Sequence, residues 1–330
     1  MPINNYGVFK GRVIDGKRET GQDTPHYQIH LLSNNTHYRV AVNVKSQESP
    51  SELLYLLDTN FRHPVTGLIA KLPSGFTSLQ QQKKPGGLAL DFIRGNLFHP
   101  SDMKLLPYNV PGADNDLSDL IEHYVLQAKS SSEAEVCAFG QRWGPEPKVK
   151  DKIFGFLPGN GIHDIHMNQG NSPQFAKDDG VYQDGALIFH FPATNEWVAL
   201  FLAFQSQAWH TDDQTGHAIV TPEVLDKEIL IVAALVNPAG TAKQNITLLN
   251  TSPERINLTG WSLADITKTP IPLSGIIEGG ATRQIELPAN LRLDSHGGII
   301  TLLNGKELKV HGVSYTQEQT KKKGWTTVFK

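Results

Sequence analysis

The chain has 330 residues, of which 39% are hydrophobic and 19% are charged, and its formal net charge is −3. A chain of this length is typical of about two domains and can bury at least one sizeable core. The small acidic excess gives no global signal for a nucleic-acid partner or for binding to an acidic membrane surface.

The single cysteine, Cys137, excludes an intramolecular disulfide. Its neighbours in "EVCAFG" are apolar, so we expect a buried thiol and not a nucleophile, which would need a cationic and exposed setting. The N-terminus has no apolar signal-peptide core, and no apolar stretch has the length of a transmembrane helix. These features predict a cytoplasmic protein.

The N-terminal region predicts a β meander, because residues 26–32 and 37–45 alternate between apolar and polar side chains. A two-residue turn at Asn34–Asn35 would place His30 opposite Arg39 on the polar face of a hairpin. That face gathers four candidate substrate-binding residues: His26, His30, Arg39 and Lys45. They could hold a phosphate or carboxylate, or they could form an ordinary solvated sheet face.

Two helices are expected in the middle of the N-terminal region. Residues 49–57, "SPSELLYLL", predict a short helix that begins with a capping box, and residues 59–87 are expected to form a loop. A longer amphipathic helix begins near residue 116, with Asp114 or Asn115 as its N-cap.

Three further strands are predicted at residues 134–143, 184–191 and 196–204, and "PATN" forms the turn between the last two. Together these elements predict an α+β N-terminal domain, residues 1–220, that is rich in antiparallel sheet.

The composition changes after about residue 215, and residues 212–227 are the expected linker. From residue 229 onward, short strands alternate with turns at a spacing of roughly 8–12 residues, which is typical of an all-β sandwich or barrel. We expect this second domain to span residues 226–330.

The C-terminal part resembles the lamin tail domain family over about residues 230–316. The resemblance rests on "ITLLNTSPERINLTGWSLAD" and on "LDSHGGIITLLNGKELKVHGVSY". It implies an immunoglobulin-like β-sandwich that serves as an interaction or attachment module and carries no catalytic residues.

Residues from about 6 to 215 are similar to the YukJ-like family, also called domain of unknown function 2278. The resemblance rests on "YGVFKG", "LDFIRGNLF", "FGFLPGNGIHDIHMNQGN" and "DGVYQDGAL". It implies no established activity.

The segment "GIHDIHMNQGN", residues 161–171, is the strongest candidate for a functional site. On a strand, His163 would face away from His166, and we expect His163 to be the more buried of the two. His166 could act as a general acid or base. The candidate catalytic residues are His166, Asn168, Asp164 and His163. The alternative is a turn-rich loop whose polar side chains satisfy backbone groups.

His163 and His166 are also candidate ligands of a divalent metal, although a strand would place them on opposite faces. Three more candidate substrate-binding residues lie near this segment or elsewhere in the chain: Arg94, Gln169 and Asp184. The alternative role for Arg94 and Asp184 is to belong to a buried arginine–aspartate pair that braces loops.

These residues support three hypotheses of function. The first is a hydrolase that acts on a phosphoester or a peptide-like bond, or on a small anionic substrate. The second is a non-catalytic module that binds a peptide or protein in the same groove, with the β-sandwich as a second contact surface. The third is a structural scaffold.

Overall fold

The computed structural model describes residues 6–19, 25–46, 52–79, 97–98, 102–110, 115–165, 185–204, 228–265, 270–288, 292–305 and 309–329. The N-terminal elements are β1 (Tyr6–Arg18), β2 (His26–Ser33), β3 (Thr36–Asn43), β4 (Leu53–Asp58), α1 (Val65–Ala70), β5 (Gly75–Ser78), β6 (Lys104–Leu105), α2 (Asp116–Ser130), β7 (Glu135–Glu146), β8 (Gly159–Ile165), β9 (Gly185–Phe191) and β10 (Glu196–Phe204).

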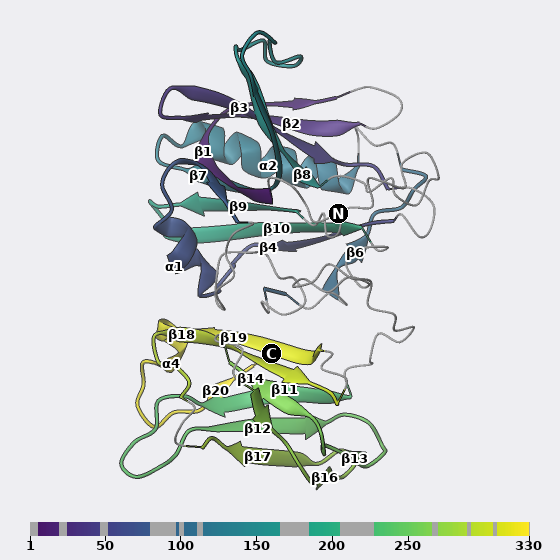
Figure 1. Ribbon diagram of the computed structural model, residues 1–330, viewed down its shortest axis with the longest axis vertical. Coiled ribbons are helices and arrows are strands. Elements are labelled where there is room, and N and C mark those ends of the chain that lie inside the picture. Colours follow the sequence, from purple (N-terminus) through teal and green to yellow (C-terminus); the bar gives the residue numbers. More distant parts are fainter. Residues whose placement is uncertain are drawn as a thin grey trace.

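Five strands of the N-terminal part close into a barrel (Figure 1). The order around the barrel is β1, β2, β3, β8 and β7, and β7 pairs back with β1. The pairing of β3 with β8 is parallel, and the other pairings of the barrel are antiparallel. Strands β9, β10, β4 and β6 extend the sheet outward from β7, so the prediction that the N-terminal part is rich in antiparallel sheet is confirmed.

The hairpin of β2 and β3 has the predicted register. Asn34 and Asn35 adopt φ values of 46° and 62°, as the two central residues of the hairpin turn that matches the twist of the strands. His30 consequently pairs with Arg39. The apolar side chains of both strands fill the barrel interior, which leaves the polar side chains on the outer face.

Helix α2 begins at the predicted N-cap. Asn115 accepts a hydrogen bond from the Ser118 N–H at 2.8 Å through Oδ1, and its Nδ2 donates to the Val44 carbonyl at 2.7 Å. The cap therefore also ties the helix to the chain that follows β3. The buried side of the helix, which packs against the barrel, comprises Leu117, Ile121, Val125 and Ala128.

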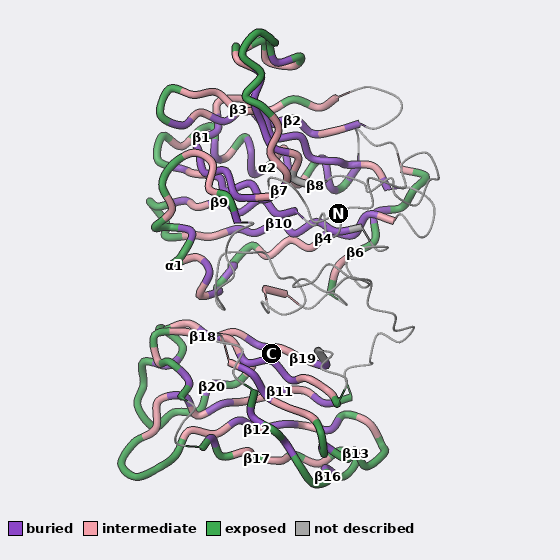
Figure 2. Tube along the Cα trace, in the orientation of Figure 1, coloured by how far each residue is buried: buried purple, intermediate pink, exposed green. Residues whose placement is uncertain are grey.

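Two apolar clusters lie on either side of the N-terminal sheet, where the strands are largely buried (Figure 2). One cluster fills the barrel and includes Tyr27, Ile29 and Val40. The other packs α1 against β7, β9 and β10 and includes Ile69 and Phe201. None of the described helices combines the length and the apolar character needed to cross a membrane.

The prediction of a short helix at residues 49–57 is wrong. Residues Leu53–Asp58 form β4, which pairs with β10 and β6. Leu53, Leu54 and Tyr55 are all buried, so apolar side chains cover both faces of the strand. A short apolar run of this kind does not distinguish a buried strand from a helix.

The prediction of a loop over residues 59–87 is also wrong, because this stretch contains α1 and β5. The start of α1 carries no ordinary capping residue. Instead, His63 Nδ1 accepts a hydrogen bond from the Val65 N–H at 3.0 Å. Histidine is not among the residues that signal a helix start in a sequence.

The C-terminal elements are β11 (Ile229–Leu235), β12 (Asn245–Asn250), β13 (Ile256–Asn257), β14 (Ser262–Ala264), β15 (Pro270–Pro272), β16 (Ile276–Ile277), β17 (Thr282–Glu286), β18 (Gly297–Leu303), β19 (Lys309–Thr316), α4 (Gln317–Thr320) and β20 (Thr327–Val328). They form two four-stranded sheets and one two-stranded sheet. Both four-stranded sheets contribute to one apolar cluster, with Ile246 from the first and Leu302 from the second. The predicted series of short strands is confirmed, while the domain boundary and the immunoglobulin-like fold stay predictions.

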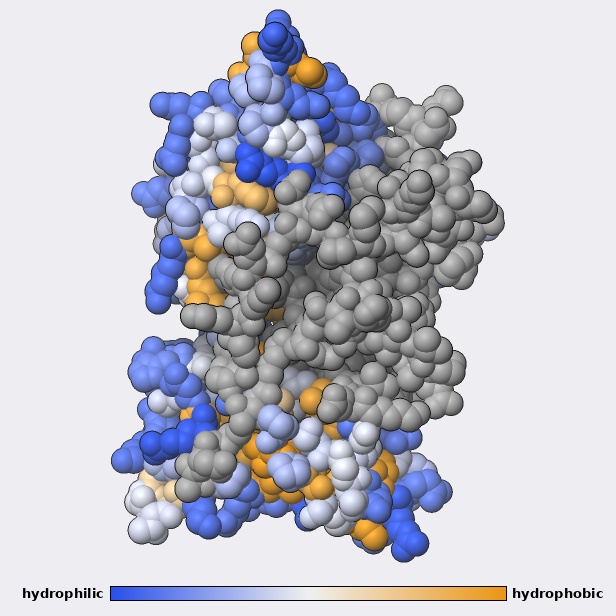
Figure 3. Space-filling model, in the orientation of Figure 1, coloured by the Kyte–Doolittle hydropathy of each residue, from blue (hydrophilic) through white to orange (hydrophobic). Residues whose placement is uncertain are grey.

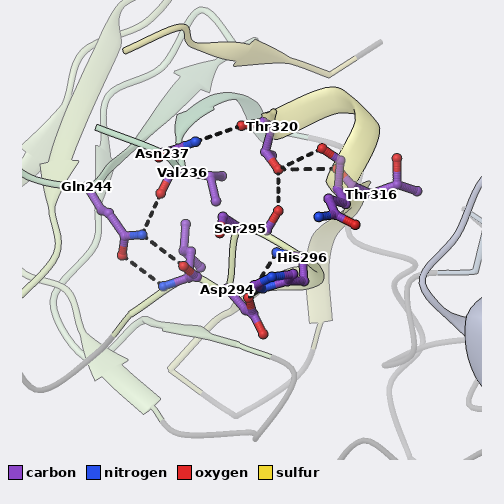
Figure 4. Close-up of polar contacts among 10 residues, drawn as sticks. Val236, Asn237, Gln244, Asp294, Ser295, His296, Thr316 and Thr320 are labelled. Carbon is purple, nitrogen blue, oxygen red and sulfur yellow. Dashed lines mark hydrogen bonds and ion pairs between the residues drawn. The ribbon is translucent and has the colours of Figure 1, made fainter. Parts of the chain in front are cut away.

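Side-chain hydrogen bonds join the loops at one end of these sheets (Figure 4). Gln244 Nε2 donates to the carbonyls of Val236 at 2.5 Å and Leu293 at 2.8 Å, and Gln244 Oε1 accepts from the Leu293 N–H at 2.8 Å. Thr320 Oγ1 donates to the Ser295 carbonyl at 2.7 Å, which attaches α4 to the same region.

Replacing Gln244 with leucine should lower the free energy of unfolding by roughly 2–3 kcal/mol, because the partly buried backbone groups of Val236 and Leu293 lose their partners. Urea denaturation measures the change. The matched control is Gln284→Leu, since Gln284 makes an exposed hydrogen bond to Asn245 and should change stability by less than about 0.5 kcal/mol. Equal losses in both variants would contradict the bridging role of Gln244.

Candidate functional site

The outer face of the barrel carries one row of residues across four strands. His30 of β2 pairs with Arg39 of β3, Arg39 pairs with Gly161 of β8, and Gly161 pairs with Trp143 of β7. A Cβ atom on Gly161 would collide with the Trp143 ring and with the Arg39 carbonyl. Because Gly161 has no side chain, the indole of Trp143 can lie across β8.

Arg39 is engaged within the protein. Its Nε donates to Asp151 Oδ2 at 2.6 Å, its Nη1 donates to Gln28 Oε1 at 2.9 Å, and its guanidinium carbon lies 4.7 Å from the centre of the Trp143 ring. The side chains of Arg39 and Asp151 are only 9% and 1% exposed. Arg39 was predicted to hold substrate charge, whereas its contacts in the structure fix a loop to the barrel.

That loop connects β7 to β8 and spans residues 147–158; we call it the lysine arm, after Lys148, Lys150 and Lys152. It forms the tip of the hairpin that projects beyond the barrel (Figure 1). At the top of Figure 3, this tip presents hydrophilic residues beside hydrophobic ones. All three lysines are exposed.

Asp151 organises the lysine arm from within. Its Oδ1 accepts hydrogen bonds from the N–H groups of Ile153 at 3.0 Å and Phe154 at 2.8 Å, and its own N–H donates to the Phe156 carbonyl at 2.8 Å. Burial opposes ionisation of this carboxyl, but the Phe154 N–H and the Arg39 guanidinium outweigh it and hold the pKa below its ordinary value. Asp151 is thus a buried, charged anchor.

Two phenylalanines of the lysine arm stack on the histidines of the hairpin. The His30 ring lies 4.8 Å from the Phe154 ring and 5.1 Å from the Phe156 ring, nearly parallel to both. His30 Nε2 also lies 2.8 Å from His37 Nδ1. Burial among these rings, with a smaller contribution from His37, lowers the pKa of His30. His30 is therefore held mainly in its neutral form near pH 7.

The two remaining histidines on this face lie near the end of β8. The His163 ring is 5.1 Å from the Trp143 ring and 5.6 Å from the His26 ring, and His26 Nδ1 lies 3.4 Å from Glu19 Oε2. His163 is half-buried on the outer face. β8 runs parallel to β3, so the chain leaves β8 at the end of the face where His26 lies.

The other predicted site residues fall into two groups. Asp164 belongs to β8, and Lys45 follows β3, where its N–H donates to Asn43 Oδ1 at 2.8 Å. Five lie outside the described residues: Arg94, His166, Asn168, Gln169 and Asp184. The catalytic roles, and the relative burial of the two motif histidines, therefore stay predictions.

A metal site likewise stays a prediction. Within the described part of the chain, no group of three or more histidine, cysteine, aspartate or glutamate side chains could hold a metal ion. His163 is present on the face, but its predicted co-ligand His166 is not among the described residues.

The buried thiol expected at Cys137 is confirmed, and burial raises its pKa to about 12.

The lysine arm is the part of the site that the sequence interpretation missed. One available signal was the lysine at every second position of "KVKDK", residues 148–152. This pattern does not distinguish a solvated loop from a charged binding segment. The stacking of Phe154 and Phe156 on His30 depends on long-range packing and had no local signal.

Replacing Arg39 with methionine should lower the free energy of unfolding by roughly 3–5 kcal/mol, because Asp151 would stay buried without its counter-charge. Chemical denaturation measures the loss. The double variant Arg39→Met/Asp151→Leu leaves no buried charge and should recover a large part of it. A double variant no more stable than the single one would show that the ion pair is not the anchor.

Replacing Phe156 with alanine should raise the pKa of His30 toward its ordinary value of 6.5, because the imidazole loses part of the burial that disfavours its charged form. Titration of the histidine ring signals by NMR measures the shift. Val149→Ala changes an exposed residue of the same arm and should leave the His30 titration as it is in the wild type. An unchanged His30 pKa in Phe156→Ala would contradict the stacking arrangement.

Comparison with known proteins places the N-terminal part in a family. A family model described as "Uncharacterized conserved protein (DUF2278)" matches residues 1–216. The chain is 45% identical over 216 residues to "Uncharacterized protein YukJ" of Bacillus subtilis (strain 168), an alignment that covers 64% of this chain and 93% of that protein. No solved structure matches, and the resemblance of the C-terminal part to lamin tail domains stays a prediction. The family resemblance of the N-terminal part is confirmed: the chain belongs to the DUF2278 family.

Proposed function

We propose that this protein is a binding module and that its lysine arm, with the adjoining outer face of the barrel, binds an extended anionic ligand. The observation that carries this proposal is the orientation of charge in the arm. Asp151 turns inward and is neutralised by Arg39, while Lys148, Lys150 and Lys152 are exposed.

The lysine arm is therefore more positive than its sequence suggests. The chain as a whole has a formal net charge of −3, and the arm concentrates three cations that form no ion pair with a described carboxylate. Glu146, at the base of the arm, is the nearest exposed acid in the sequence. Clustered lysines attract a polyanion over several ångströms and release its counter-ions on binding.

The engagement of Arg39 favours binding over catalysis. In a hydrolase, Arg39, Lys45 or Arg94 was expected to hold substrate charge. Of these three, Arg39 uses its guanidinium to bond to Asp151 and Gln28. The hydrogen bonds of Asp151 hold the arm in place, which lowers the cost of ordering it when a ligand binds.

A hydrolase is the alternative proposal. The observation that favours it is the proximity of His26 and His163, whose rings lie 5.6 Å apart at the end of β8. His166 is the first residue after β8 in the sequence. In this proposal it would act as general acid or base, with Asn168 and Asp164 as orienting groups. Loss of a hydrolytic activity in His166→Ala, with ligand affinity unchanged, would support this alternative.

For the C-terminal part we propose an attachment surface, as the resemblance to lamin tail domains implies. Its support is that residues central to the resemblance lie in the core: Leu258, Leu263 and Tyr315 are fully buried, and Trp261 packs against them. The two sheets would present a second contact surface, separate from the barrel's ligand site.

The charge proposal is tested with long-chain inorganic polyphosphate as the probe. The triple variant Lys148→Glu/Lys150→Glu/Lys152→Glu should bind it at least about tenfold more weakly than the wild type, and the wild-type affinity should fall steeply as salt is added. Isothermal titration calorimetry at two salt concentrations measures both effects.

The matched control reverses the charge of Lys321, Lys322 and Lys323, three exposed lysines near the C-terminus. It changes the net charge of the chain by the same amount and should leave polyphosphate affinity within about twofold of the wild type. A wild type that does not bind, or a control that loses affinity as much as the arm variant, would refute the proposed site.

A further inference from the structure

We propose that the anionic ligand is a single-stranded nucleic acid whose bases stack on ring-bearing side chains of the outer face while the lysine arm holds its phosphates. The proposal rests on the polyanion binding proposed above and adds the ligand's chemical class. It is carried by three features of the barrel: its architecture, its partly exposed rings and the apolar residues of the arm.

The first feature is the arrangement of strands. Five strands close in the order β1, β2, β3, β8 and β7, with β3 parallel to β8, and α2 lies between β3 and β7 in the chain together with β4, α1, β5 and β6. Five-stranded Greek-key barrels that bind oligonucleotides and oligosaccharides use their second and third strands and the connections 1–2 and 4–5. The corresponding described elements here are β2, β3 and the lysine arm.

Architecture alone does not assign a ligand, but side chains on the lysine arm, on β2 and β3 and on the adjoining β7 have the required chemistry. Trp143, Phe154 and Phe156 are each partly exposed, and they gather with His30 and Arg39 on the outer face. Stacking of successive bases on such rings, combined with a cationic groove along the backbone, is the usual mode of binding for single strands.

The tip of the lysine arm adds apolar contacts to its charges. Val149 and Leu157 are 52% and 57% exposed, and Val149 lies in the sequence between two of the exposed lysines. A surface that held phosphates alone would gain nothing from exposed aliphatic side chains. Beside cations, these groups can contact sugars and base faces.

The same features discriminate against two other polyanions. A duplex keeps its bases stacked on one another, so rings on an outer protein face cannot reach them without unpairing the strands. Inorganic polyphosphate has no planar groups, so it would use the lysines and leave the rings unused. A single strand is the ligand that uses both.

The test uses the full chain and a fluorescent oligothymidylate of about 20 nucleotides, with polyphosphate of similar length and a duplex as competitors. Fluorescence anisotropy should show that the oligonucleotide binds at least about tenfold more tightly than polyphosphate at equal salt, and more tightly than the duplex. Binding should also quench the fluorescence of Trp143, and Trp143→Phe should remove that quenching while it keeps a ring at the site.

Two variants separate stacking from charge. Phe154→Leu/Phe156→Leu keeps apolar volume in the arm and should weaken oligonucleotide binding by about tenfold while polyphosphate affinity is unchanged. Phe329→Leu, a partly buried phenylalanine of the C-terminal part, is the control and should affect neither ligand. Because the quenching experiment needs no change in the arm, it tests the proposal even if the double variant does not fold.

The outcomes distinguish this inference from the proposed function. The inference is overturned, while polyanion binding stands, if polyphosphate binds as tightly as the oligonucleotide and the phenylalanine variant does not weaken oligonucleotide binding more than polyphosphate binding. Tighter binding of the duplex than of the single strand also overturns it. If the wild type binds neither probe, both proposals are refuted.

Discussion

The buried ion pair between Arg39 and Asp151 is the interaction on which the geometry of the outer face depends. One guanidinium contacts Gln28 on β2, Asp151 in the lysine arm and Trp143 on β7, and it projects from β3. Two buried charges stabilise the fold only while both are present, since either one alone would remain buried without its counter-charge. The ion pair therefore positions the arm, and removing either Arg39 or Asp151 alone should destabilise the protein.

The ion pair also explains how an acidic chain can present a basic surface. Asp151 is removed from the surface together with Arg39, and the charged side chains that remain exposed in the arm are lysines. Net charge is a sum over the whole chain, and it does not report which charges are cancelled in the interior. The absence of a global basic excess in the composition was therefore a poor guide to this face.

Local signals predicted much of the fold. The Asn34–Asn35 turn and the strict alternation around it predicted the β2–β3 register, and Asn115 was one of the two residues named as the cap of α2. The helix expected at residues 49–57 was wrong because apolar runs carry no periodicity when both faces are buried. The arm could not be predicted, because Arg39 and Asp151 are 112 positions apart and only the closed barrel brings them together.

The parallel pairing of β3 with β8 has a consequence for synthesis on the ribosome. Since β8 ends at residue 165, a nascent chain shorter than this carries a β3 whose outer edge has no neighbour. Unpaired edges invite pairing with other chains, and pairings between distant segments form slowly. The edge of β3 therefore stays without its parallel neighbour through the translation of more than a hundred further residues, and the barrel can close only once β8 has been made.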